Sequence, residues 1–476
     1  MERGKPLKIL KKLFDMEKGF YMHVLILALP IAAQSLITIG VNMLDNIMVG
    51  RGLGETELSA VSLANQFISI YHIFCMGLGM GASVLVSRYW GMREKEPEKA
   101  MEALRKTICI MVRLTVSLAA IFAILTYFFP NEVMSLFVKV GEEQDVIEKG
   151  HVYLAFSVIT YFFLGLSLTC TIVLRSVGQV KMPLYVSIGA FFVNLLANYG
   201  FIFGNFGLPR MEVAGAAIGT LIARIYEATV ICGYLFFVDK KIGFRLKNLL
   251  MKTGDLVGEY VRISIPVLIS DGILAFGNTA VAMVIGRLGK SFIAANSVTA
   301  TTQQMSSVMI QGVCQAGAIV TGQTLGQGDK EKAQRQGFGF LGFGLALGLV
   351  SAAFIIIASG PIIGYFQLSD ETSEMATKLM EAISLIVVFQ ATNSIMTKGV
   401  LRGGGDTKML MLADNIFLWA LSIPLGCLAG FVWHLSPFWI YIALKFDQIA
   451  KAVWCVLRLR SGKWIKRIKT GKNDMG

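Results

Sequence analysis

Long apolar segments alternate with short polar connections along almost the whole chain. Each apolar segment has roughly the 20 residues that an α-helix needs to cross a bilayer, and residues 338–363 contain no charged side chain. Because unpaired backbone groups are costly in lipid, we expect every segment to be helical. The pattern predicts twelve spans, at residues 22–47, 61–87, 107–129, 151–174, 184–204, 213–238, 260–286, 292–325, 337–363, 377–400, 409–432 and 438–457.

Composition agrees with a membrane protein. The chain is 55% hydrophobic and only 16% charged, with a mean hydropathy of +0.63, whereas soluble domains average about 25% charged residues. Its seven cysteines lie within or at the ends of apolar segments and form no CxxC or Cys/His motif, which argues against structural zinc and redox chemistry.

The net charge of +13 is placed as the positive-inside rule requires. Most Lys and Arg residues lie at the N-terminus, in every second connection and in the tail, so both termini are predicted to face the cytoplasm and the chain to lie in the plasma (inner) membrane. No basic stripe interleaved with aromatic residues is present, so we expect the lipid bilayer, not nucleic acid, as the partner of these charges.

The two halves of the chain resemble each other. LPIAAQSLITIGVNMLDNIMVGRGLG aligns with IPVLISDGILAFGNTAVAMVIGRLG, and one offset pairs Pro30 with Pro266 and Asn42 with Asn278. GMREKEPEKA then pairs with GQGDKEKA, and LRSVGQVK with LRGGGDTK, in the same order. Because each half has an even number of spans, both start on the same side. This predicts an all-α polytopic protein of two pseudo-symmetric six-helix bundles in a parallel repeat.

Domain limits follow from these patterns. The basic N-terminus, with leucines against lysines, is predicted to be an amphipathic helix on the cytoplasmic leaflet; a disordered basic segment is the alternative. The predicted organisation is an amphipathic helix at 1–20, an N-lobe at 21–238, a cytoplasmic linker at 239–258, a C-lobe at 259–457 and a basic cytoplasmic tail at 458–476.

The motifs at the span boundaries carry a family resemblance. With LDNIMVGRGLGETELSAVSLANQ at the end of the first span, and LRSVGQVKMP, GRLG and LRGGGDTK further on, the chain resembles the multidrug and toxic compound extrusion (MATE) family over residues 20–457. The resemblance implies a secondary active antiporter that exports small organic, often cationic, compounds in exchange for H⁺ or Na⁺. We expect no cofactor apart from the coupling ion, and no obligate protein partner is evident.

Asp45 is the first candidate for coupling, because a carboxylate within a span is costly and therefore points to function. The resemblance marks Asp45 as the cation-coupling acid, with Asn194, Asn198 and Thr220 as its polar partners. A carboxylate with amide and hydroxyl oxygens can hold Na⁺ or share a proton. Relatives carry a second acid where this chain has Asn198. The alternative is that Asp45 is a hydrated residue at the outer interface.

Other charged residues within spans leave two interpretations each. Asp271, near the middle of the seventh span, is either a second coupling or substrate-binding acid in the C-lobe or a buried packing group. Arg224 and Glu227 are three residues apart and share one helix face. This spacing favours a structural ion pair, and participation in transport is the alternative.

Neutral polar side chains within the spans are candidates for a substrate cavity: Gln34, Gln66, His72, Asn278, Gln303, Gln304, Gln390 and Asn393. Amides that pack helices together, and a hydrogen-bonded buried histidine, are the alternatives.

Competing functions are less well supported. A lipid-linked oligosaccharide flippase of the same superfamily is the main alternative, but it would need basic residues deep in the membrane, and these are few. The chain has no HExxH motif or catalytic constellation, so we expect no enzyme activity, and it has no Walker A motif for ATP. It also lacks the filter-like loop of a channel.

Overall fold

The computed structural model of the protein describes residues 19–135, 144–366 and 368–468. Within these ranges the chain is helical and forms no β-strand. Ten described helices are long and apolar enough to cross a membrane. The two other predicted spans, 292–325 and 438–457, are each built from two shorter helices that meet near Ser307 and Lys445. Nearly all of the predicted amphipathic helix at 1–20 lies outside the described residues.

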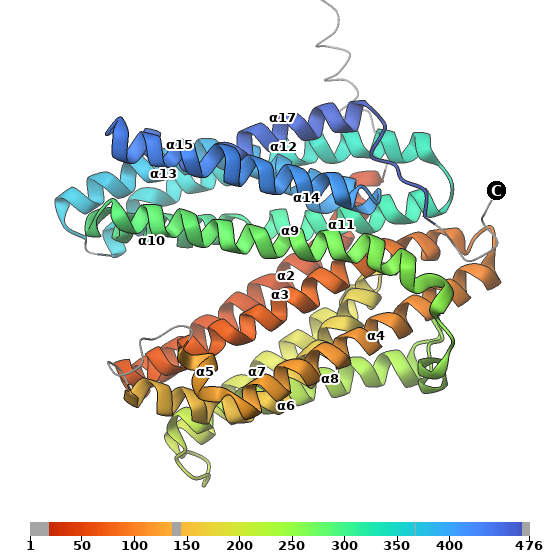
Figure 1. Ribbon diagram of the computed structural model, residues 1–476, viewed down its shortest axis with the longest axis horizontal. Helices are drawn as coiled ribbons and strands as arrows, with labels where there is room; N and C mark the ends of the chain where they lie inside the picture. Colours follow the sequence, from red (N-terminus) through yellow and green to blue (C-terminus); the bar gives the residue numbers. More distant parts are fainter. Residues whose placement is uncertain (1–18, 136–143, 367, 469–476) are drawn as a thin grey trace, which may run out of the picture. The chain divides into compact units, whose positions relative to one another are not determined.

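The first half of the chain supplies the red to yellow-green helices of Figure 1. Their bounds are α2 (Phe20–Gly52), α3 (Glu55–Met92), α4 (Pro97–Phe128), the short α5 (Pro130–Ser135), α6 (Gln144–Ser176), α7 (Lys181–Phe203) and α8 (Glu212–Gly233), which continues into a π-helical turn at Tyr234–Val238.

The second half supplies the green to blue helices. They are α9 (Gly254–Arg287), α10 (Lys290–Ser306), α11 (Val308–Gly326), α12 (Lys330–Tyr365), α13 (Asp370–Ser394), α14 (Thr407–Ile416), α15 (Ile423–Cys427), α16 (Pro437–Leu444) and α17 (Phe446–Arg460). Three π-helical segments, Ile395–Leu401, Phe417–Ser422 and Leu428–Val432, extend α13, α14 and α15.

The helices are longer than the apolar segments that predicted them. Helix α4 begins at Pro97, ten residues before the predicted start at 107, because proline suits the first turn of a helix and the charged residues after it continue the helix outside the apolar region. Helix α12 begins at Lys330, where the Asp329 side chain accepts a hydrogen bond from the Lys332 amide at 2.8 Å. The apolar runs therefore mark only the central parts of these helices.

Contacts divide the chain into two compact units. One contains the described residues of 1–32, 87–96 and 265–468, and the other contains 33–86 and 97–264. In the second unit α8 packs against both α6 and α7. In the first unit α13 packs against α12, α16 and α17. Each unit therefore has its own helical core.

The segment predicted as a polar linker, 239–258, is fixed to α4 by arginines. Arg113 donates to the backbone oxygens of Leu249 (2.6 Å) and Met251 (3.0 Å). Arg105 donates to the oxygen of Ile242 at 3.1 Å. A short 3-10 helix, Leu246–Leu250, lies in this segment. Because backbone oxygens in and around such a short helix lack regular helical partners, these side chains satisfy them and hold the linker in place.

The described part of the basic tail is docked as well. Trp464 is completely buried and its indole N–H donates to Gln334 Oε1 at 2.8 Å. Arg458 forms a bidentate ion pair with the carboxylate of Asp406, with N–O distances of 2.7 and 3.1 Å. Several tail residues therefore serve packing and pairing within this unit.

Candidate functional site

The carboxylate of Asp45 on α2 meets a buried amide on α7. Asn198 Nδ2 donates to Asp45 Oδ1 at 2.6 Å and also lies 3.3 Å from Asn194 Oδ1, one turn earlier on the same helix. Both asparagines are at least 95% buried, whereas Asp45 is partly exposed. Three of the four residues predicted for cation coupling therefore form one hydrogen-bonded chain.

Two glycines on α8 allow α7 to approach closely enough for this arrangement. A Cβ atom at position 219 would lie 2.0 Å from Asn198 Oδ1, and one at 215 would lie 2.4 Å from the backbone oxygen of Phe201. Gly215 and Gly219 form a GxxxG motif, which lets two helices in a membrane pack backbone to backbone. The sequence GAAIG at 215–219 is the local signal for this contact.

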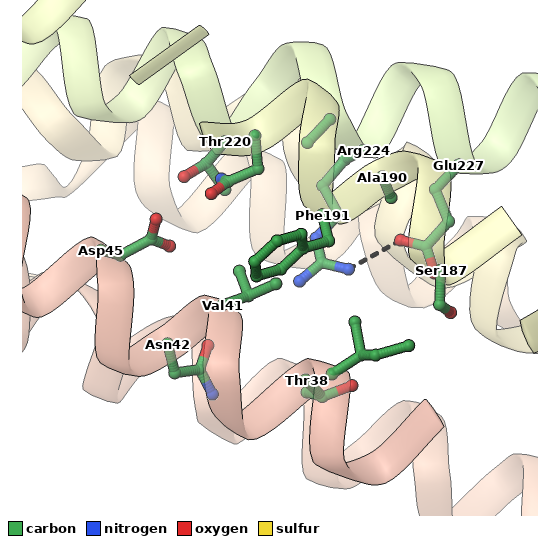
Figure 2. Close-up of a pocket in the computed structure, with 13 residues that line it drawn as sticks. Thr38, Val41, Asn42, Asp45, Ser187, Ala190, Phe191, Thr220, Arg224 and Glu227 are labelled. Carbon is green, nitrogen blue, oxygen red and sulfur yellow. Dashed lines mark hydrogen bonds and ion pairs between the residues drawn. The ribbon is translucent and has the colours of Figure 1, made fainter. Parts of the chain in front are cut away.

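A cavity opens beside Asp45 between α2, α7 and α8 (Figure 2). It contains about 60 Å³ of space, enough for a few water molecules. Polar side chains supply much of its wall, and apolar ones supply the remainder. The lining residues are Ile37, Thr38, Val41, Asn42, Asp45, Ser187, Ala190, Phe191, Asn194, Thr220, Ala223, Arg224 and Glu227.

Thr220 completes the predicted coupling set on the α8 wall of the cavity. Its neighbour Tyr153 on α6 interacts with it and donates through its hydroxyl to Asn65 Oδ1 at 3.2 Å. Nothing in the sequence distinguishes Tyr153 or Asn65 from other residues of their spans. They extend the polar network away from Asp45 toward α3.

Arg224 and Glu227 form the ion pair that their spacing predicts. Arg224 Nη1 lies 2.7 Å from Glu227 Oε2. Both side chains line the same cavity as Asp45, with 30% and 12% of their surfaces exposed. The pair is therefore not enclosed within the bundle; it faces the space next to the candidate coupling acid.

Equivalent arginines of the repeat make corresponding contacts in the two halves. Arg175 in LRSVGQVK donates to the side-chain oxygen of Gln34 on α2. Arg402 in LRGGGDTK lies 3.3 Å from Asp271 Oδ1 on α9. In each half, an arginine after the fourth span therefore reaches the first helix of that half. Asp271 is paired with a nearly buried arginine in this structure, and its role in transport stays a prediction.

The other predicted cavity residues do not form one site. Gln34 is buried and donates to Ser187 Oγ at 2.7 Å. Two amide pairs lie in the second half, Gln303 with Gln390 (2.5 Å) and Asn393 with Gln448 (2.8 Å). The remaining four residues have exposed side chains: Gln66, His72, Asn278 and Gln304.

A buried charged cluster in the second half was missed by the sequence analysis. Lys451 Nζ lies 2.9 Å from Asp447 and 3.5 Å from Asp414, and all three side chains are at least 94% buried. Ser270 donates to the second oxygen of Asp414 at 3.1 Å. The i,i+4 spacing of Asp447 and Lys451 within a predicted span was the available signal.

The fold and the polar sites within its spans define a polytopic helical membrane protein with two matching halves. The MatE family model matches residues 30–200 and 266–428. The chain belongs to the MatE family. The two matches begin at Pro30 and Pro266, the residues that the internal alignment pairs, which confirms the repeat.

Curated relatives match along nearly their whole length. The chain is 25% identical over 446 residues to the probable multidrug resistance protein NorM of Thermotoga maritima, covering 93% of this chain and 92% of that protein. It is 24% identical over 427 residues to the uncharacterized transporter YisQ of Bacillus subtilis, covering 89% and 90%.

Solved structures share the fold. A multidrug resistance MATE family transporter of the MOP superfamily, described in an outward-facing conformation, superposes with a TM-score of 0.81 at 18% identity, covering 93% of this chain and 96% of that one. A MOP superfamily transporter from Pyrococcus furiosus gives 0.80 at 18% identity, with the same coverage. The predicted twelve-span fold of two six-helix bundles is confirmed.

Proposed function

We propose that this protein is a secondary active efflux antiporter that exports small organic, often cationic, compounds in exchange for H⁺ or Na⁺. Both termini face the cytoplasm in this proposal, and the protein lies in the plasma membrane. The single observation that carries the proposal is the Asp45 carboxylate, held by Asn198 at 2.6 Å beside a small polar cavity within the spans.

The chemistry of this cavity suits a small cation. The carboxylate of Asp45 provides a formal charge, and Asn194, Thr220 and Asn42 bring amide and hydroxyl oxygens to the same cavity. These are the ligands that Na⁺ and other hard cations prefer, and the same carboxylate can take up a proton instead. Water-sized space next to Asp45 supports a site for an ion and its hydration.

The names of the relatives support the transported class. Several curated relatives that match over most of the chain carry the name multidrug resistance protein NorM. A parallel repeat lets the two lobes rock about a central site, so that it opens to one side of the membrane at a time. Charging and discharging Asp45 would bias this change, because a ligand shifts a conformational equilibrium only by its differential affinity for the two states.

Efflux from vesicles tests the proposal. The purified protein is reconstituted into liposomes with a fluorescent organic cation inside the compartment from which export occurs, and a proton or a sodium gradient is then imposed separately. The proposal predicts efflux driven by at least one of the two gradients and abolished when that gradient is collapsed. Equal efflux in protein-free liposomes, or efflux insensitive to both gradients, would refute it.

A further inference from the structure

We infer that Arg224 is a tethered counter-ion of the coupling site. Its guanidinium competes with the transported cation for the carboxylate of Asp45. The inference rests on the proposed function and adds a residue that sets how tightly the site holds its cation. It gives the Arg224–Glu227 pair a place in the transport cycle in addition to its contribution to packing.

The side chain of Arg224 lies where its charge can act on Asp45. Arg224 comes from α8 and Asp45 from α2, yet both side chains line one cavity (Figure 2). The charge of Arg224 acts on Asp45 and also on His72 of α3. The side chain of Arg224 is 30% exposed and lines the cavity next to Asp45. It therefore has room to change partners.

Two arginines act on the carboxylate of Glu227. Arg224 is bound to it at 2.7 Å, and the charge of Arg175 on α6 also acts on it. A buried carboxylate left without a counter-ion would be costly. Since the charge of Arg175 would still act on Glu227 when Arg224 turns away, this cost is reduced and the exchange of partners becomes feasible.

The polar and ionisable groups that line the cavity or act electrostatically on its residues come from five helices. Helix α7 contributes uncharged side chains to the cavity, such as Asn194 and Ser187. The ionisable groups that act in or next to the cavity are Asp45 on α2, His72 on α3, Tyr153 and Arg175 on α6, and Arg224 and Glu227 on α8. Among the described residues, Asp45 is the carboxylate of this set that has no ion pair. It is therefore the group with which Arg224 would pair after it leaves Glu227.

A tethered cation has a defined consequence for an antiporter. When Asp45 holds a proton, Na⁺ or an organic cation, Arg224 stays with Glu227. When the site releases its cation, Arg224 can neutralise Asp45 and make release easier. Removal of this charge should therefore strengthen cation binding at Asp45 and slow the release step.

The test compares Arg224→Gln with wild type in proteoliposomes, under the gradient that drives efflux. We expect the cation concentration for half-maximal efflux to fall by about tenfold or more, because a positive charge near a partly buried site is removed. For protons this is a rise of about one pH unit or more in the midpoint. Arg224→Lys should restore much of the wild-type midpoint. Lys106→Gln removes an equal charge from a pair with Asp255 outside the cavity, and should leave the midpoint in place.

A wild-type midpoint in folded Arg224→Gln protein would overturn the inference. If this variant does not fold, Arg224→Gln with Glu227→Gln removes both partners of the pair and should still show the shifted midpoint; an unshifted midpoint there would overturn the inference equally. Failure of the proposed function is seen separately, as full gradient-driven efflux in Asp45→Asn, whereas failure of the inference alone leaves Asp45→Asn inactive.

Discussion

Lys451→Met should destabilise the protein strongly, because it leaves two carboxylates without their cation. The lysine is 4% exposed and lies between Asp447 at 2.9 Å and Asp414 at 3.5 Å, which are 3% and 6% exposed. Breaking a buried ion pair by removing one partner costs about 3–5 kcal/mol, since the remaining charge stays desolvated. For a unit of about 200 residues this corresponds to a fall in Tm on the order of 10 °C.

The assay is the fraction of monodisperse protein in detergent after heating, measured by size-exclusion chromatography. Lys378→Met is the matched control: it makes the same change in another i,i+4 pair, with Glu374 at 2.5 Å, but both side chains are exposed. Surface pairs contribute little, so this variant should melt close to wild type. Neutralising Asp414 and Asp447 together with Lys451 should recover much of the loss. Equal melting of Lys451→Met and Lys378→Met would refute the reasoning.

Two further predictions concern helix packing and orientation. Gly219→Ala should lower gradient-driven efflux at least about tenfold with modest loss of folded yield. The added Cβ would lie 2.0 Å from Asn198 Oδ1 and would displace the side-chain amide that donates to Asp45. Gly233→Ala on the same helix, where a Cβ meets nothing within 4 Å, is the control and should behave as wild type; equal activity of the two variants would contradict the packing argument. In intact cells an impermeant thiol reagent should label Glu371→Cys from outside and label Arg93→Cys and Lys463→Cys only after permeabilisation, and labelling of all three from one side would contradict the predicted topology.

The sequence predicted the helices well because, in lipid, a helix is the main structure in which backbone N–H and C=O groups can all form hydrogen bonds. It did not predict the helix ends, since the charged turns that begin α4 and α12 carry no apolar signal. The break at Ser307 and the π-helical turn at Phe417–Ser422 also lack a distinctive local pattern.

The candidate site was predictable in part. Contacts between residues far apart in the sequence could not be predicted. The family resemblance selected Asp45 and Asn198, and the structure brings them to 2.6 Å. By contrast, Arg402 lies in the connection between the predicted spans 377–400 and 409–432, yet it is 6% exposed and reaches Asp271, 131 residues away in sequence. Ion pairs between distant spans depend on the packing of the helices, and no local pattern encodes them.

The most direct measurement of the central proposal is gradient-driven efflux by Asp45→Asn in proteoliposomes. The substitution keeps the size and hydrogen-bonding capacity of the side chain but fixes it in a neutral state, so it can neither bind Na⁺ by charge nor exchange a proton. Asp370→Asn, the same change at an exposed position at the start of α13, is the control. The proposal predicts normal folded yield for both variants, efflux near the protein-free background for Asp45→Asn and wild-type efflux for Asp370→Asn. Efflux by Asp45→Asn at the wild-type rate under the same gradient would contradict it and direct attention to Asp271.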